Sequence, residues 1–228
     1  MADVPRPWRR QFFLPPWKES RAGRTKCSTD QSVEGGGAVA RSAEILGAAA
    51  DLFHTRGYHA TTMDDIAHAV GLKKGSLYHY VSAKDVLLRT LAEETIAGYL
   101  ADGERIAGEG GTASERLARV IEAHVRRLCA APERVTVLVR ESHYVPDELA
   151  AEVRGMTRRY NHLVADLIAE GIAAGEFEPR DPAVAALMLL GALNWAHRWY
   201  QSDGRLTPGE IGRQFAQTFL DGMRRRGE

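Results

Sequence analysis

Apolar residues recur every three or four positions along most of the chain after residue 37, which is the period of a helix with one buried face. A first helix is predicted to begin at Ala38 and to end at Gly57, because a glycine favours the left-handed conformation that closes many helices. Its buried face consists of Ile45, Ala49, Leu52 and Phe53.

Two short helices follow the first one. Thr62 and Asp65 have the spacing of a capping box, so a second helix is predicted to begin there and to end at Gly71. A third helix is predicted over Ser76–Val81. Ser82 and Asp85 predict the start of a fourth helix, which runs to about residue 102.

Helix-start signals also punctuate the rest of the chain, at Thr112, Asp181 and Thr207. A long helix is predicted over about 147–174. The segment 135–139 has β propensity, but it lies between helix signals and is predicted to be a buried helix. No stretch alternates in the manner of a strand, so the expected fold is all-α with about nine helices.

The first 37 residues lack this periodicity and contain prolines and a triple glycine, which predicts a flexible N-terminal extension over 1–37. It is either an inert tail or a basic arm that contacts DNA. A three-helix domain is expected over 38–91 and a second helical domain over 92–228.

Charge is balanced overall but not along the chain. Thirty basic and thirty acidic residues give no net charge, which excludes a protein that is basic over its whole surface. Residues 1–40 carry a net charge of +3, residues 41–90 one of +1 and the remainder one of −4. The front half is therefore the expected side for a polyanionic partner.

Other features exclude several protein classes. The longest apolar run, residues 182–193, is too short to cross a bilayer, which takes about 20 residues. No signal peptide is evident, and two distant cysteines favour a reducing, cytoplasmic location without a membrane partner. The eight histidines have no metal-ligand spacing, and no catalytic motif appears. No metal, no cofactor and no enzymatic activity are expected.

Two short helices joined by a glycine-containing turn, on a longer first helix, are the parts of a helix-turn-helix, whose second helix enters the major groove of DNA. The lysines suit phosphate, the compact polar residues suit base edges, and the threonine lies at a helix N-terminus. The alternative is a small helical core with solvated lysines. The candidate DNA-contacting residues are Thr62, Lys73, Lys74, Gly75, Ser76, Tyr78, His79 and Lys84.

The run TTMDDIAHAVGLKKGSLYHYVSAKDVLL, residues 61–88, closely resembles the DNA-binding domain of the TetR family of transcriptional regulators. The matching residues are Thr62, Ile66, Ala67, Gly71, Gly75, Ser76, Leu77, Tyr78, Tyr80, Lys84, Asp85 and Leu87. Departures from the family pattern are Val70, Leu72, Val81 and Ala83, of which the first three still suit a core.

This resemblance implies a homodimer that reads a pseudo-palindromic DNA operator. It implies that Lys74, Ser76, Tyr78 and His79 lie on the recognition helix and that Thr62 and Lys84 contact flanking phosphates. Leu77 and Tyr80 are expected in the core.

The C-terminal part would bind a ligand and form the dimer. Residues 181–200 and the stripe Ile211, Phe215 and Phe219 are the expected dimer helices. The segment 191–223 resembles the C-terminal end of TetR-type regulators of fatty-acid and sterol catabolism, the KstR2 and FadR-like groups, whose effectors are acyl-CoA thioesters. Arginine suits phosphate and tryptophan stacks on bases. The candidate ligand-binding residues are Arg158, Arg159, Asn194, Trp195, Arg198 and Trp199.

Three functions remain open at this point. The first is a repressor released by an acyl-CoA, and the second is the same DNA-binding dimer with a drug or a signalling lipid as its effector. The third is a helical ligand-binding or enzymatic protein without a DNA function, in which the tryptophans are core aromatics and the arginines are solvated.

Overall fold

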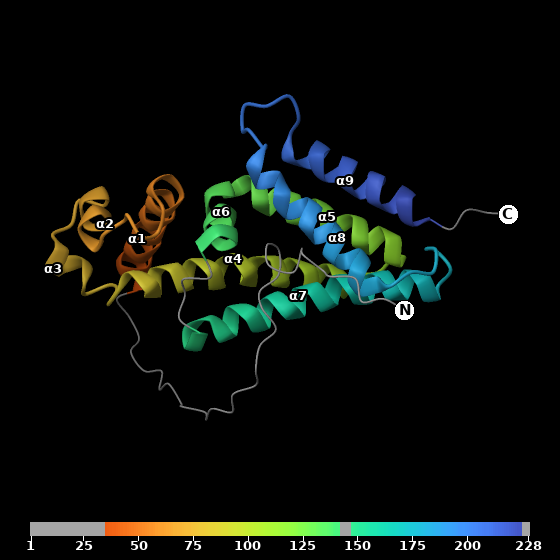
Figure 1. Ribbon diagram of the computed structural model, residues 1–228, viewed down its shortest axis with the longest axis horizontal. Helices are drawn as coiled ribbons and strands as arrows, with labels where there is room; N and C mark the ends of the chain where they lie inside the picture. Colours follow the sequence, from red (N-terminus) through yellow and green to blue (C-terminus); the bar gives the residue numbers. More distant parts are fainter. Residues whose placement is uncertain (1–34, 142–146, 225–228) are drawn as a thin grey trace, which may run out of the picture. The chain divides into compact units, whose positions relative to one another are not determined.

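A computed structural model describes residues 35–141 and 147–224 of the chain. The extension predicted for the N-terminus lies almost wholly outside these residues. Within the described ranges the chain forms nine α-helices and one short 3₁₀ helix, and the only extended pairing there is an isolated bridge between Phe177 and Arg224, which confirms the all-α prediction (Figure 1). The helices are α1 (Gly35–Arg56), α2 (Met63–Ala69), α3 (Lys74–Leu77), α4 (Lys84–Ala107), α5 (Ala113–Ala130), α6 (Pro132–Glu141), α7 (Asp147–Ala173), α8 (Pro182–Trp195), η3 (Ala196–Arg198) and α9 (Pro208–Met223).

Most helix boundaries follow the predicted capping signals. Gly57 and Gly71 have φ angles of +85° and +66°, which glycine adopts without the steric cost that other residues meet. Asp181 accepts hydrogen bonds from the first amides of α8. Capping boxes are present at the starts of α2, α5 and α9, where Thr62 pairs with Asp65, Thr112 with Glu115 and Thr207 with Glu210.

Three boundaries differ from the prediction. Helix α3 covers Lys74–Leu77 instead of Ser76–Val81, although single helical hydrogen bonds continue as far as Val81. The residue that precedes α4 is Ala83, which has no side-chain oxygen, so Ser82 does not cap this helix. Helix α4 also continues beyond residue 102 to Ala107, because its apolar face still packs against the core there.

Helices α1, α2 and α3 and the first turns of α4 enclose one hydrophobic core. Phe53, Ile66, Leu77 and Leu88 are almost fully buried in it. The cluster also includes Val137 of α6, which is 1% exposed. A residue from far along the chain thus completes the core of the helix-turn-helix.

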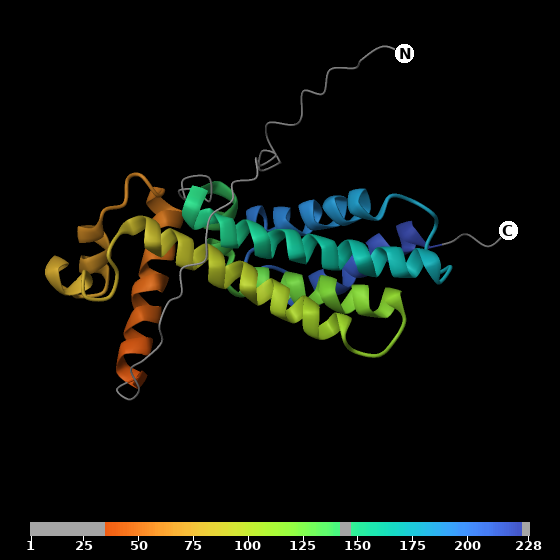
Figure 2. The same ribbon diagram turned by 90° about the horizontal axis from the view of Figure 1, so that it is seen from below.

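A second core is formed by the C-terminal part of α4 with α5, α7, α8 and α9. Leu117, Ile121, Leu128, Ile168 and Leu193 are its most deeply buried members. Helices α4 and α7 lie side by side, and α5 packs between α4 and α9 (Figures 1 and 2). No helix of the described residues is long and apolar enough to span a membrane.

Candidate DNA-binding surface and ligand pockets

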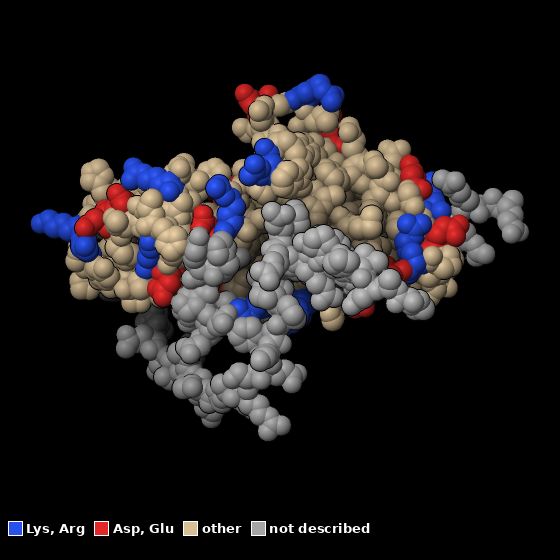
Figure 3. Space-filling model, viewed as in Figure 1, with Lys and Arg blue, Asp and Glu red and all other residues tan. Residues whose placement is uncertain are grey.

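The segment 73–80 is held to the protein by a single buried side chain. Leu77 has no exposed surface, whereas Lys73, Lys74, Tyr78 and His79 around it are exposed. Lysine and arginine side chains lie at the end of the molecule formed by α1–α3, with acidic side chains between them (Figure 3). The candidate residues of α3 therefore face solvent, as a groove-reading helix requires.

Acidic residues of α2 partner some of the candidate cations. The ammonium of Lys74 lies 2.9 Å from the carboxylate of Asp64, and this hydrogen bond raises the pKa of Lys74. Both side chains are more than half exposed, so phosphate competes with Asp64 for Lys74 at little cost. Lys73 forms no ion pair within the described part of the chain.

Thr62 is engaged differently from the expectation. Its backbone N–H and its hydroxyl donate to the carboxylate of Asp65 at 2.8 and 2.6 Å, and these bonds lower the pKa of Asp65. The N-terminus of α2 thus already holds an anion. A phosphate contact by Thr62 would have to displace this carboxylate.

Lys84 is tied into the fold. Its ammonium donates to the backbone carbonyls of Tyr58 and Thr61 at 2.6 and 2.7 Å, and it lies 4.3 Å from the centre of the Tyr58 ring. Burial lowers the pKa of Lys84. This geometry favours a structural role for Lys84 in place of the expected phosphate contact.

Burial separates the two residues of α3 and its following turn that were expected in the core. The prediction for Leu77 is confirmed, but Tyr80 is 45% exposed, about as much as Tyr78. Tyr80 was wrongly placed because it occupies a family-matching position, which does not fix the direction of a side chain. The apolar departures Val70 and Val81 are buried, and Leu72 packs against the same core.

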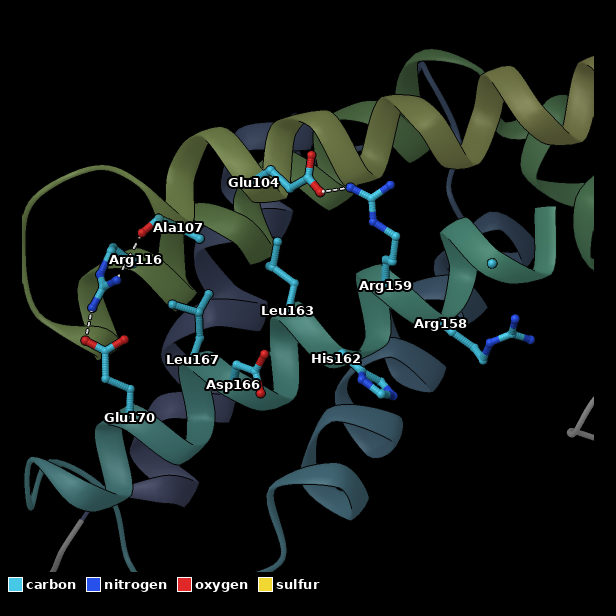
Figure 4. Close-up of a pocket in the computed structure, with 11 residues that line it drawn as sticks. Glu104, Ala107, Arg116, Arg158, Arg159, His162, Leu163, Asp166, Leu167 and Glu170 are labelled. Carbon is cyan, nitrogen blue, oxygen red and sulfur yellow. Dashed lines mark hydrogen bonds and ion pairs between the residues drawn. The ribbon is translucent and has the colours of Figure 1, made fainter. Parts of the chain in front are cut away.

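Two of the six candidate ligand residues, Arg158 and Arg159, line a pocket between α4 and α7 with a volume of about 760 Å³ (Figure 4). Arg159 donates to Glu104 across the pocket, and Arg116 donates to Glu170 and to the Ala107 carbonyl. Most of the guanidinium groups around this pocket therefore already have carboxylate partners.

Asn194 belongs to a buried polar network instead. Its Oδ1 lies 3.2 Å from Nε2 of His124, and Nδ1 of His124 lies 3.0 Å from the hydroxyl of Tyr160. Burial lowers the pKa of His124 to about 4, against the opposing effect of the Asn194 hydrogen bond, so the ring is neutral at pH 7. Sequence reasoning assigned His124 only a general core or solvated position and missed this network.

The remaining three candidates lie on the surface at the end of α8. Trp195 and Trp199 are 55% and 48% exposed, so they are not core aromatics. The guanidinium of Arg198 lies 5.5 Å from the Trp195 ring, and Trp199 stacks on Phe215 of α9. The six candidate ligand residues therefore occupy three separate places and do not form one site.

Both cores correspond to known families. Residues 45–91 match the family described as bacterial regulatory proteins, tetR family, and residues 110–223 match the tetracyclin repressor-like C-terminal domain. The chain is 28% identical to the HTH-type transcriptional repressor KstR2 of Rhodococcus jostii, over 82% of this chain and 93% of the relative. It is 25% identical to the fatty acid metabolism regulator protein of Bacillus subtilis, over 79% of this chain and 94% of that protein.

Solved structures agree with these matches. The ketosteroid transcriptional regulator KstR2 of Mycobacterium tuberculosis superposes with a TM-score of 0.77 at 25% identity, over 82% of this chain and 96% of that one. The regulator AibR, solved in complex with isovaleryl coenzyme A and operator DNA, superposes with a TM-score of 0.70 at 25% identity, over 80% and 97% of the two chains. The relatives are regulators and not enzymes, and the chain belongs to the TetR family of transcriptional regulators.

Proposed function

We propose that this protein is a homodimeric repressor that binds a pseudo-palindromic operator in the cytoplasm and leaves it when an acyl-CoA thioester binds. The observation that carries the DNA-binding part is the exposed segment 73–80, held by the buried Leu77 on a helix-turn-helix of the TetR family. Lys73, Tyr78 and His79 are then the residues nearest to DNA, with Gly75 and Ser76 allowing the close approach of the backbone.

The proposal of a homodimer rests on an exposed apolar stripe along α8. Val184, Met188 and Trp195 fall on one helical face, and Met188 is 68% exposed. Soluble proteins rarely leave such contiguous apolar surface in water. We infer that a second copy of the chain covers it, so that α8 and α9 pair with their counterparts and Trp195 lies in that interface.

The effector class rests on the relatives. KstR2 is a ketosteroid regulator, the Bacillus subtilis relative regulates fatty acid metabolism, and AibR was crystallised with isovaleryl coenzyme A. An acyl-CoA combines an apolar acyl chain with a strongly anionic nucleotide. The present chain has a helical core domain with arginine-lined pockets on its surface, which suits both parts.

Helix α6 is the element through which we expect ligand binding to reach the DNA-binding part. Val137 contributes to the core of the helix-turn-helix, while Val135, two residues earlier, is buried in the second core. A ligand that binds better when α6 is displaced will shift the protein toward a state that binds DNA less tightly. Equal affinity for the two states would produce no release.

A direct test titrates the purified full-length protein against the intergenic DNA upstream of its own coding sequence, with and without a panel of acyl-CoA thioesters. We expect retardation of this DNA that one or more thioesters abolish, and a Leu77→Asp variant as the non-binding control. Retardation that no thioester alters would replace the effector class. Retardation that increases with a thioester would reverse the direction of control, and no retardation of any upstream fragment would refute the proposal.

A further inference from the structure

A groove between α4, α5 and α6 concentrates arginine side chains. Its volume is about 510 Å³, and it lies away from the α4–α7 pocket of Figure 4, since no residue lines both. Two carboxylates, those of Glu94 and Asp102, also line it. Four arginines therefore give the groove an excess of positive charge, and they are Arg105, Arg126, Arg127 and Arg134.

Arg127 is held in a fixed position at this groove. Its Nε and Nη2 donate to the same carboxylate oxygen of Asp102 at 2.9 and 2.6 Å. The guanidinium lies directly against Gly98 of α4, where an added Cβ would come within 2.4 Å of its Nη1. Any larger residue at position 98 would displace this arginine, so the backbone of α4 provides a cradle for it.

The two outer arginines are held only by neighbours on their own helices. Arg126 pairs with Glu122 and Arg105 with Glu109, each one turn away, and both arginine side chains are more than half exposed. Such exposed pairs contribute little to stability. A ligand anion can therefore take over these guanidinium groups at small cost, and arginine binds phosphate oxygens through two parallel N–H donors.

The inner wall of the groove includes a buried hydroxyl without a partner. Tyr99 lines the groove and is 4% exposed, and its hydroxyl forms no hydrogen bond in the structure. Leaving such a group unsatisfied is costly, and it is found where another molecule or water completes the site. The Tyr99 ring lies 4.4 Å from His124, so the groove borders the buried polar network.

The α4–α7 pocket is less suited to an anion. Three carboxylates, of Glu104, Asp166 and Glu170, line it beside its three arginines, so its charge is nearly balanced. The first turn of α6 borders the α4–α5–α6 groove instead, and the N-terminal end of a helix adds a favourable field for an anion.

We infer that the α4–α5–α6 groove binds the phosphate groups of the effector, a ligand that carries a nucleotide diphosphate. Arg105, Arg126 and Arg127 bind the phosphates, and the hydroxyl of Tyr99 donates to an acceptor on the part of the ligand that points inward. This inference rests on the proposed function, because the ligand is the same effector.

The position of the groove also explains how its occupation reaches DNA. Arg134 of α6 pairs with Glu94 of α4 at 3.0 Å, and both residues line the groove. A phosphate that attracts Arg134 weakens this link between the two helices. Helix α6 carries Val137 in the core of the helix-turn-helix, so a displacement of α6 acts directly on that core.

Calorimetric titration of the full-length protein with coenzyme A, isovaleryl coenzyme A and ADP tests the inference. We expect Arg126→Ala and Arg105→Ala each to raise the Kd for these nucleotides about tenfold, the effect of losing one hydrogen bond to a charged group. The matched control is Arg158→Ala in the α4–α7 pocket, which should leave Kd unchanged.

Tyr99→Phe is the sharpest variant, because it removes only the unsatisfied hydroxyl. We expect its Tm to equal or exceed that of the wild type, while the Kd for isovaleryl coenzyme A rises about tenfold. A residue that served only in packing would not separate these two measurements. Normal nucleotide binding by Tyr99→Phe, Arg126→Ala and Arg105→Ala together, or a loss caused by Arg158→Ala alone, would overturn the assignment.

The two proposals can fail separately. Operator retardation by each variant without ligand measures the DNA function independently of the groove. Should the wild type bind operator but no CoA compound, while ADP binds and Arg126→Ala weakens it, the groove is supported and the acyl-CoA effector is not. Should neither CoA compounds nor ADP bind the wild type, the groove assignment is refuted even if operator binding stands.

Discussion

The ammonium of Lys84 lies 2.7 Å from the carbonyl oxygen of Thr61, which ties the first turn of α4 to the chain that leads into α2. The Lys84→Met variant keeps the aliphatic stem over the Tyr58 ring and loses the donor to both carbonyls. We expect the free energy of unfolding in urea to fall by about 2 kcal/mol, the range for hydrogen bonds to a charged group. An unchanged free energy of unfolding would show that these bonds do not matter for stability.

Lys73 and Lys84 should differ in the salt dependence of operator binding. Lys73 is exposed and without an ion pair among the described residues, so Lys73→Ala should reduce the steepness of log K against log salt by about 0.9, the value for one phosphate contact. Lys84→Met, compared at the same temperature, should leave this slope unchanged. Binding measured between 50 and 200 mM salt gives both slopes, and a reduction for Lys84→Met alone would restore the phosphate role to Lys84.

His79 should contribute to sequence recognition more than to general affinity, because it is an exposed hydrogen-bonding side chain beside the α3 helix. We expect His79→Ala to lower affinity for the operator by about 1–3 kcal/mol and to leave affinity for random DNA unchanged. Competition between operator and random fragments measures the ratio. An equal loss on both kinds of DNA would assign His79 to the phosphate backbone.

A charge on the α8 stripe should break the proposed dimer. Met188 is the most exposed large apolar residue of that helix, so Met188→Glu places two carboxylates in the interface of a two-fold dimer. Sedimentation at micromolar concentration should then show a monomer, and operator affinity should fall at least tenfold. Ala151→Glu on the exposed surface of α7 is the matched control, and a Met188→Glu protein that remains dimeric would place the interface elsewhere.

Stability should depend on pH through His124. Its pKa is about 4 in the folded protein and 6.5 without burial, so the unfolded chain binds more protons between these values. The stabilisation is complete above pH 6.5 and is lost as pH falls toward 4, by about 2 kcal/mol at pH 5. Urea unfolding at pH 7.5 and 5.0 measures it. His124→Gln should lack this part of the loss, and equal losses in both proteins would contradict the assignment.

Local signals made much of the fold predictable. The capping boxes at Thr62, Thr112 and Thr207 act within one turn, and therefore the sequence alone defines those helix starts. The weak boundaries are those without such a signal, as at Ala83, where tertiary packing decides the helix start. The segment 135–139 became a helix despite its β propensity because it packs against two cores.

The site was less predictable than the fold. The exposure of Tyr80 and the internal bonding of Lys84 depend on which way a side chain points, which a motif does not encode. The six ligand candidates were grouped by residue type and neighbourhood along the chain, yet the structure separates Arg159 from Asn194 and Trp195. Arg127 and Tyr99 meet across two helices, and only their packing against each other reveals the groove.

The burial of Val137 among residues of α1–α4 affects how this regulator could be recombined with others. A chimera that joins its first 91 residues to a foreign sensor domain would leave an apolar gap where Val137 was. Such a fusion should be less stable than either parent and deaf to the new ligand, unless the graft also carries α6. The practical unit of exchange is thus a discontinuous one, made of the N-terminal helices together with a segment some fifty residues further along the chain.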